Sequence, residues 1–437
     1  MKIKTKIKPY DEVINLPRPK HRHPRKQSPI LRKAMNAVSN PDLKNVDFEL
    51  KTGDMKGINE NEPALYLMNH SCFTDLEIST RAIHGSYNIV CTSDGFVGKE
   101  GLMRAMGCIP TEKFQPDIRL IKDISYSLKK LKSSVLMYPE ASYSFDGTAT
   151  PLPVSLGKLI KALGFPVIMI RTHGAFIHDP LYNGLRVRQN KITAEKYTLF
   201  TPNELSGVKA PEINSKLKEA FTFDNFAEQL SSKTLISEDF RAEGLSRVLY
   251  KCPVCGTEGK MTSHRTAITC EECKTKWLLS ELGQMEIIDK AFDGKTAAPQ
   301  LFKHIPDWYA WERECVKKEL EDGSYSLDIP VKIRMMVDYK AIYEVGDGTL
   351  THNSEGFHLS GCEGKLEFTQ KPLASYSLYS DYFWYELGDM ICIGDKEKLF
   401  YCFPSEEMDV VAKTRLAAEE LYKLKKNAFR FGFFPSP

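Results

Sequence analysis

The chain has 437 residues, which at roughly 150 residues per domain is enough for about three folded units. Apolar residues make up 42% and charged residues 27% of the sequence, so wholesale disorder and a fibrous repeat are both excluded. No apolar run approaches the roughly 18 residues that a membrane-spanning helix needs, and the first residues lack the apolar core of a secretory signal. We therefore expect a protein without membrane spans, which leaves peripheral attachment to a membrane open.

Charge and cysteine are unevenly distributed along the chain. The formal net charge is only +3, but residues 1–33 hold eleven Lys and Arg against two acidic residues. Seven of the eleven cysteines are scattered without paired spacing, which is typical of a reducing compartment. We expect a cytoplasmic protein with a basic N-terminal arm over residues 1–45, extended because Lys alternates with Ile and Thr before four prolines.

Strand-like and helical stretches alternate between residues 46 and 230, and this alternation predicts an α/β domain. The apolar strand-like runs are 64–68, 88–91, 134–138 and 166–171, and the helical stretches are 75–84, 117–132 and 151–163. A polar linker, 231–250, follows this domain and leads into a small cysteine-containing module at 251–280.

The rest of the chain predicts a helical connector at 281–323 and a β-rich domain at 324–437. The connector holds a helix at 306–321, with Pro at its first turn and Gly just beyond its end. Short runs rich in Tyr, Ile, Val and Phe, separated by Gly-containing turns, predict strands up to residue 404. A helix at 405–426 closes this domain, which resembles the pleckstrin-homology-like architecture of a β barrel capped by one helix.

The first chemistry-bearing motif lies where the strand at 64–68 gives way to a helix. It reads Asn69-His70-Ser71-Cys72-Phe73-Thr74-Asp75, so a loop histidine precedes an aspartate in the first helical turn. At this spacing the carboxylate of Asp75 can fix one ring nitrogen of His70 and leave the other as a general base for a hydroxyl nucleophile. The alternatives are an acidic helix start with a chance histidine, or a thiol nucleophile at Cys72.

Three further motifs follow in order. The strand at 134–138 runs into Tyr138-Pro139-Glu140-Ala141-Ser142-Tyr143-Ser144, which places a carboxylate and two hydroxyls at the carboxyl end of a strand, where open α/β sheets bind ligands. Between this motif and the first lies a segment at 107–113 that ends in Lys113. The fourth is the run at 164–170, which begins Gly-Phe-Pro and is followed by Arg171.

The order and spacing of these four motifs resemble the glycerolipid acyltransferases, the family of lysophosphatidate acyltransferases, over about residues 60–210. The resemblance implies a glycerolipid-acyltransferase-like α/β fold and transfer of a fatty acyl group from acyl-CoA or acyl carrier protein to a hydroxyl of a lysophospholipid-type acceptor. It also implies His70 as general base and Asp75 as its orienter. Glu140 and Lys113 would hold the acceptor, with Ser142, Ser144 and Arg171 as further candidate substrate-binding residues.

Two positions depart from the family pattern. Ala141 stands where the family usually has Gly, and Ala disfavours a backbone with positive φ. Tyr143 stands where the family usually has Arg, so a charge-assisted contact to phosphate is missing. Because of these departures, the identity of the acceptor stays open. The second hypothesis is a catalytically inactive acyltransferase-like scaffold that binds partners through its zinc ribbon and its β-rich domain.

Four cysteines predict a structural zinc site. Cys252 and Cys255 form one Cys-x-x-Cys pair and Cys270 and Cys273 a second, with 14 residues between them, which is the spacing of a zinc ribbon. Four thiolates leave no open coordination position, so such an ion stabilises the fold rather than acting on substrate. Few cations lie between the two pairs, so no nucleic-acid partner is expected.

The basic arm has three possible partners. Each Lys or Arg near an anionic lipid surface contributes about 1 kcal/mol, which favours a peripheral position on the inner face of the cell membrane. Docking onto an acidic acyl carrier protein, or no partner at all, are the alternatives. Four phenylalanines, Phe429, Phe431, Phe433 and Phe434, suit insertion into a lipid interface, and docking onto the protein's own core is the other possibility.

Overall fold

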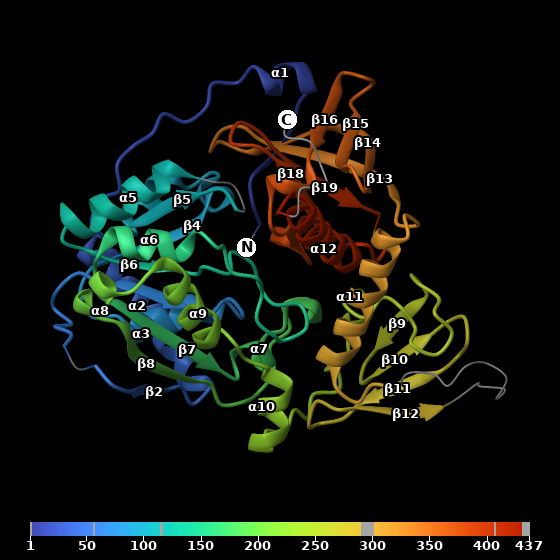
Figure 1. Ribbon diagram of the computed structural model, residues 1–437, viewed down its shortest axis with the longest axis horizontal. Helices are drawn as coiled ribbons and strands as arrows, with labels where there is room; N and C mark the ends of the chain where they lie inside the picture. Colours follow the sequence, from blue (N-terminus) through green and yellow to red (C-terminus); the bar gives the residue numbers. More distant parts are fainter. Residues whose placement is uncertain (1, 56, 114–116, 290–300, 406–407, 431–437) are drawn as a thin grey trace. The chain divides into compact units, whose positions relative to one another are not determined.

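A computed structural model describes residues 2–55, 57–113, 117–289, 301–405 and 408–430 (Figure 1). The chain divides into two compact units. The α/β unit comprises residues 20–180 and 187–225, and the C-terminal unit comprises residues 1–19, 181–186 and 226–437. Within the described ranges, no helix combines the length and apolarity needed to cross a bilayer.

A seven-stranded mixed sheet forms the centre of the α/β unit. In spatial order its strands are β2 (Glu49–Thr52), β8 (Thr193–Phe200), β7 (Val167–His173), β3 (Leu65–Met68), β6 (Ser134–Met137), β4 (Tyr87–Thr92) and β5 (Cys108–Thr111). The five strands from β7 to β5 are parallel, and β8 runs antiparallel to β7. The four strands expected from the sequence are confirmed, whereas β2, β5 and β8 were not predicted.

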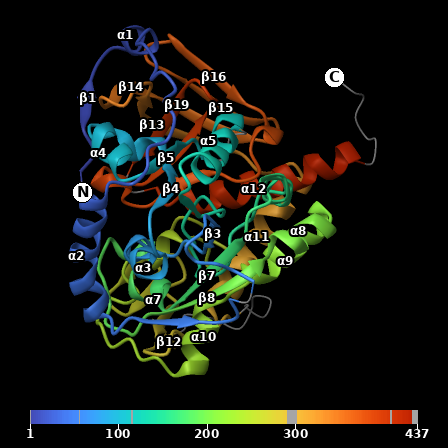
Figure 2. The ribbon, with the colours of Figure 1, turned by 90° about the vertical axis from the view of Figure 1, so that its left-hand side faces the viewer.

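Helices cover both faces of this sheet, and its central strands are therefore apolar on both sides. Their bounds are α2 (Pro29–Asn45), α3 (Thr74–Ala82), α5 (Ile118–Lys129), α6 (Leu156–Leu163), α8 (Pro202–Gly207) and α9 (Ala210–Ala220). In the view of Figure 2, α2 and α3 lie on one side of the sheet and α8 and α9 on the other. All four residues of β3 are buried, and Leu65 and Leu67 pack in one core with residues of α5, α6 and α9.

The expectation of an extended arm over residues 1–45 is wrong for its second half. Residues 29–45 form α2, which begins with Pro29 at a position where its missing N–H breaks no helical hydrogen bond. Burial of Leu43 fixes one side of this helix. The first half contains β1 (Thr5–Ile7), which pairs in parallel with a strand of the C-terminal unit, and the short helix α1 (Tyr10–Ile14).

The C-terminal unit contains two sheets. The smaller is antiparallel, with β9 (Met261–His264), β10 (Ala267–Cys270), β11 (Lys276–Leu279) and β12 (Met285–Asp289). The larger follows the path β16 (Leu366–Gln370), β15 (Gly356–Gly361), β14 (Ile342–Asn353), β13 (Leu327–Met336), β19 (Leu399–Pro404), β18 (Met390–Gly394) and β17 (Tyr379–Asp381), with β1 paired to β14. The β-rich prediction is confirmed, while the pleckstrin-homology-like architecture stays a prediction.

Both predicted helices of this unit are present. They are α11 (Ile305–Glu321) and α12 (Val411–Arg430), and they pack against each other. On α12, Ala412, Leu416 and Ala417 are fully buried, as expected of a helix that covers a core. Phe431, Phe433 and Phe434 lie outside the described residues, as does the side chain of Phe429.

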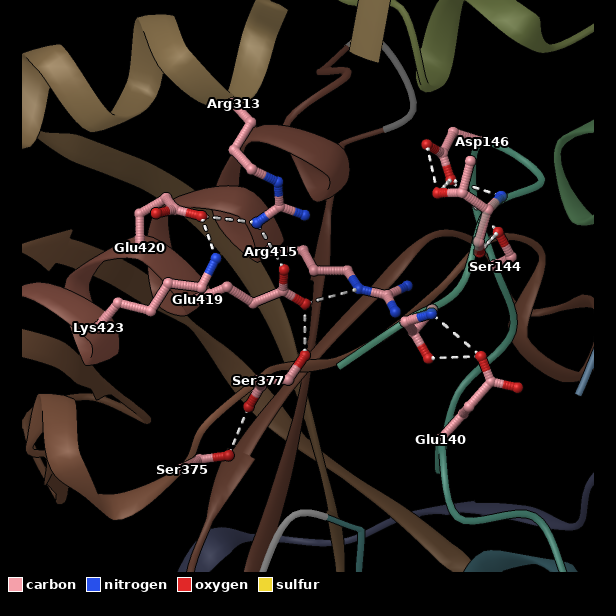
Figure 3. A network of polar contacts seen from close by, with 12 residues as sticks. Glu140, Ser144, Asp146, Arg313, Ser375, Ser377, Arg415, Glu419, Glu420 and Lys423 are labelled. Atoms are coloured by element: carbon pink, nitrogen blue, oxygen red, sulfur yellow. Dashed lines mark hydrogen bonds and ion pairs between the residues drawn. The ribbon is translucent and has the colours of Figure 1, made fainter. Parts of the chain in front are cut away.

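A buried carboxylate joins α12 to its neighbours (Figure 3). Glu419 is 1% exposed and lies 2.8 Å from the guanidinium of Arg313 on α11 and 3.5 Å from that of Arg415. The hydroxyl of Ser377 also donates to it, at 2.6 Å. Burial alone would raise the pKa of Glu419, but the two arginines lower it. Removing either arginine would leave a buried charge without full compensation, so this network is structural.

Candidate active site and cysteine cluster

The two loops that carry the predicted site residues meet at one edge of the sheet. β3 and β6 are parallel neighbours, with Leu67 opposite Met137, so their carboxyl ends lie together. His70 follows the end of β3 and Glu140 follows the end of β6. The structure therefore brings together two motifs that lie about 65 residues apart in the sequence, in the position where open α/β sheets place ligands.

His70 and Asp75 form a hydrogen-bonded pair. Nδ1 of His70 lies 3.0 Å from Oδ2 of Asp75, which sits fully buried in the first turn of α3. The same oxygen accepts the backbone N–H groups of Ser71 at 2.6 Å and Cys72 at 3.1 Å. Three donors and the positive end of the helix dipole stabilise a carboxylate here, so Asp75 is held in position to orient the imidazole.

This contact determines which nitrogen of His70 is available. The carboxylate accepts a hydrogen bond from Nδ1–H of His70, so the proton of the neutral ring stays on Nδ1 and the lone pair resides on Nε2. Among the residues that the structure describes, none makes a hydrogen bond to Nε2, and the side chain is 19% exposed. Burial lowers the pKa of His70, Asp75 raises it, and the charge of Lys113 lowers it further, with a net decrease. The ring is therefore neutral at pH 7 and suited to accept a proton.

Two tyrosine rings enclose the imidazole. The ring centroid of Tyr138 lies 4.3 Å from that of His70, and the centroid of Tyr143 lies 4.2 Å from it. Tyr143 also lies 5.7 Å from Phe73. These contacts restrict rotation of the His70 ring and exclude water from its faces. Tyr143 thus has a packing role beside the imidazole.

Glu140 is buried against the backbone of the His70 loop. It is 1% exposed, and its Oε2 accepts the backbone N–H of His70 at 2.9 Å. Its Oε1 accepts the N–H and hydroxyl of Thr150, at 3.0 and 3.1 Å. Burial raises the pKa of Glu140 to about 7, although these hydrogen bonds oppose the shift. The carboxylate is thus engaged in positioning His70, a role different from the acceptor contact implied by the family resemblance.

The turn after Tyr138 contains a non-glycine residue in the left-handed region. Ala141 has φ of +57°, and its N–H donates to the carbonyl of Tyr138 at 3.1 Å. A non-glycine residue in this region costs on the order of 1 kcal/mol, which the surrounding contacts offset. Ser142 and Ser144 are both buried, and the hydroxyl of Ser144 donates to the carbonyl of Thr148 at 2.7 Å. The structure therefore gives Ser144 a role within its own turn.

The two predicted cations differ in position. Lys113 lies close enough to His70 for its charge to lower the histidine pKa. Arg171 lies on β7 next to Thr172, whose hydroxyl contacts Asn69, so the alternation of the strand directs Arg171 to the other face. There its guanidinium donates to the carbonyl of Thr222 at 3.1 Å. The structure does not bring Arg171 to His70, and we leave it out of the candidate site.

The environment of Cys72 argues against a thiol nucleophile. Its side chain is 3% exposed, and burial together with the charges of Asp75 and Asp179 raises its pKa well above the usual value. A buried thiol with a raised pKa holds too little thiolate to attack a carbonyl. Cys72 therefore acts as a small apolar residue at the strand-helix junction.

Three residues that support the site were not predicted from the sequence as site residues. Thr150 fixes Glu140, Thr172 fixes Asn69 through its hydroxyl at 2.8 Å and its N–H at 2.8 Å, and Tyr138 stacks on His70. Tyr138 had the signal of being the first residue of the motif at 138–144. Thr150 and Thr172 had none, because their partners lie far from them in the chain.

The four predicted zinc ligands form a cluster in the C-terminal unit. All four sulfurs of Cys252, Cys255, Cys270 and Cys273 lie within 4.8 Å of one another. The distances between sulfurs are 3.7 Å for Cys252 to Cys273 and 3.7 Å for Cys255 to Cys270. Sulfurs bound at 2.3 Å around a tetrahedral ion lie about 3.8 Å apart. The cluster therefore fits a metal ion of the size and geometry of Zn²⁺.

Each Cys pair lies in a turn of the same form. In the first turn the N–H of Gly256 donates to the carbonyl of Cys252 at 2.9 Å, and in the second the N–H of Lys274 donates to the carbonyl of Cys270 at 2.8 Å. Gly256 and Lys274 both have positive φ. Thr257 and Thr275 occupy matching positions, with hydroxyls 3.4 and 3.3 Å from the second sulfur of their pair. Two equivalent turns facing each other are typical of a zinc ribbon.

Side chains from α11 hold this cluster against the rest of its unit. The fully buried Trp308 lies 5.1 Å from the ring of Trp277 and donates its indole N–H to the carbonyl of Lys251 at 3.0 Å. The buried carboxylate of Glu312 accepts the N–H of Lys251 at 2.8 Å. Because Lys251 directly precedes Cys252, these contacts fix the first cysteine turn.

We compared the chain with known proteins. No protein-family model matches it, and no curated protein matches it. Among solved structures, it is similar to the crystal structure of the 1-acyl-sn-glycerophosphate (LPA) acyltransferase PlsC from Thermotoga maritima. The identity is 13%, the TM-score is 0.34, and the likeness covers 44% of this chain and 78% of that chain. At this level the likeness by itself assigns neither activity nor substrate.

Proposed function

We propose that the protein is an acyltransferase that moves a fatty acyl group from an acyl thioester to a hydroxyl of a lysophospholipid-type acceptor. The observation that carries this proposal is the His70–Asp75 pair, which leaves Nε2 of a neutral imidazole without a partner among the described residues. It stands within the ordered motifs that resemble the lysophosphatidate acyltransferases. An alcohol needs such a base, because it attacks a carbonyl effectively only as its proton is removed.

The reaction proceeds in two steps around one imidazole. Nε2 of His70 takes the proton of the acceptor hydroxyl while its oxygen attacks the thioester carbonyl carbon, and Asp75 stabilises the imidazolium that forms. The tetrahedral intermediate then collapses, the C–S bond breaks, and Nε2 returns the proton to the leaving thiolate. The products are the acylated acceptor and a free thiol, and His70 is neutral again at the end of the reaction.

The remaining residues position the reactants. Glu140 holds the His70 loop through the backbone N–H of His70. The charge of Lys113, which acts on His70, would attract an anionic acceptor headgroup. The donor would be acyl-CoA or acyl carrier protein. The basic residues of the first 33 positions would hold the protein on an anionic membrane surface, at the inner face of the cell membrane.

In the same proposal, the four-cysteine cluster binds a structural Zn²⁺. The sulfur spacing of 3.7 Å supports this assignment. Four thiolates complete the coordination of the ion, so it would stabilise the fold of residues 251–280 and take no part in acyl transfer.

The reaction is tested with the purified full-length chain. It is incubated with acyl-CoA or acyl carrier protein as donor and with a panel of lysophosphatidate, other lysophospholipids and a neutral monoacylglycerol. Mass spectrometry of the lipid extract should show a product heavier by one acyl group for at least one anionic acceptor, because Lys113 lies near the base. No acylated product with any pair would contradict the proposal and favour the inactive scaffold.

A further inference from the structure

A second group of metal-ligating side chains lies in the α/β unit, apart from both the proposed catalytic pair and the four cysteines. It consists of His21, His23 and Asp123, whose ligand atoms all lie within 4.8 Å of one another. None of these residues belongs to the motifs discussed above. Asp123 is 4% exposed, while both histidines are exposed, so the group forms a partly open site at the surface.

The short spacing of the two histidines and a ring contact with α5 hold the three side chains together. His21 and His23 are two apart in a segment without helix or strand before α2, and their ring centroids lie 5.1 Å apart. Asp123 and Tyr126 are three apart on α5 and share a face of that helix. The ring of His23 stacks on Tyr126, with centroids 4.6 Å apart and planes 18° apart.

The backbone of this segment is held in place independently of the histidines. The guanidinium of Arg104 donates to the carbonyl of Arg22 at 3.4 Å, and the amide of Asn88 donates to the carbonyl of Arg25 at 2.8 Å. The side chain of Arg22, which stands between the two histidines, lies 3.7 Å from Glu100. The positive charge that stands between the two histidines is therefore paired with an acid outside the group.

The three side chains lie close enough together to share one bound cation. Nε2 of His21 lies 3.1 Å from both oxygens of Asp123, and Nδ1 of His23 lies 3.8 Å from Oδ1. The second distance is too long for a hydrogen bond, yet this nitrogen is directed at the same carboxylate. Ligands at 2.0–2.2 Å around a tetrahedral ion lie about 3.3–3.6 Å apart, and the observed distances fall on either side of that range.

We propose that His21, His23 and Asp123 bind a divalent transition metal ion of the Zn²⁺ class. Two imidazoles and one carboxylate are the ligand set that such ions prefer over Mg²⁺ or Ca²⁺. Three protein ligands leave at least one position for water or another small ligand. Binding links the segment at 20–28 to α5 and so adds to the contacts from Arg104 and Asn88 that already hold this segment.

The test uses the full-length chain dialysed to constant metal content. Calorimetric titration with Zn²⁺ should show one equivalent of binding beyond the metal that the protein already contains. The variant His21→Gln/His23→Gln should lose this equivalent, and Asp123→Asn should weaken it by at least about tenfold, the loss typical of removing even a supporting partner of a metal ligand. In the wild type, Zn²⁺ should also slow amide exchange in residues 20–28.

The matched control is His84→Gln/His358→Gln. These two histidines are also exposed and each lies near a carboxylate, at 3.8 Å from Glu60 and 2.7 Å from Glu367. The control should bind Zn²⁺ as the wild type does. No additional equivalent in the wild type, or an equal loss in both double variants, would overturn the proposal. Unchanged melting temperatures and unchanged initial metal content exclude misfolding as the cause of a loss.

Discussion

Replacing His70 by alanine is expected to lower kcat/KM for acyl transfer by about 10²- to 10⁴-fold, the range typical of general-base catalysis. The imidazole lies where the carboxyl ends of β3 and β6 meet, and its Nε2 can take the proton of the acceptor hydroxyl. With alanine at this position, only water is left to take that proton. The side chain is partly exposed and its backbone N–H still reaches Glu140. The variant should therefore fold, and the loss should appear in the rate of product formation measured by mass spectrometry.

Two further variants test whether the loss of activity is specific to the His70–Asp75 pair. Asp75→Asn keeps the shape of the side chain but removes the charge that stabilises the imidazolium and fixes the tautomer, so it should lose activity to a similar extent. His84→Ala removes an exposed histidine just beyond α3 and should retain wild-type activity. Normal acyl transfer by His70→Ala, or an equal loss in His84→Ala, would show that His70 is not the base.

Replacing Cys270 by serine is expected to unfold the segment at 251–280 and to lower the stability of the C-terminal unit by more than about 4 kcal/mol, as loss of a structural metal does. Zn²⁺ binding in such turns is itself a source of folding free energy. The measurements are metal content by elemental analysis and hydrogen exchange of residues 251–280. Less metal and fast exchange in this segment are the expected results.

The control for the cysteine variant is Cys315→Ser. Cys315 lies on α11 in the same unit, outside the cluster, so its replacement should leave the metal content unchanged. Purified wild-type protein that contains less than about half an equivalent of Zn²⁺ before any chelator is added would contradict the zinc assignment. Slow exchange of residues 251–280 in Cys270→Ser would contradict the stabilising role of the ion.

Local sequence patterns predicted the parts of the protein that depend on nearby residues. The contact between His70 and Asp75 spans five positions across one strand-helix junction, and each cysteine pair spans three. The end of α11 was predicted by Gly323, whose positive φ the structure confirms. In all three cases, the backbone geometry of a few neighbouring residues determines the contact, the turn or the helix end.

Contacts between distant segments were not predictable in this way. Nothing in the sequence near Thr150 indicates that it fixes Glu140, and nothing near Thr5–Ile7 indicates pairing with β14. The direction of Arg171 depends on the register of β7 against β3, which only the folded sheet establishes. α2 was not predicted because Pro29, one of the prolines in the arm, was taken as a sign of extended chain, although proline is favourable at a helix start.

The proposed base is tested most directly by the titration of the His70 imidazole, followed by nuclear magnetic resonance and assigned by the signal missing in His70→Ala. The wild-type ring should have a pKa below 6.5 and, above that pKa, carry its proton on Nδ1. Asp75→Asn should lower this pKa further, because the carboxylate raises it, and Lys113→Ala should raise it. A ring that is charged at pH 7, or one that carries its single proton on Nε2, would contradict the assignment of His70 as the base.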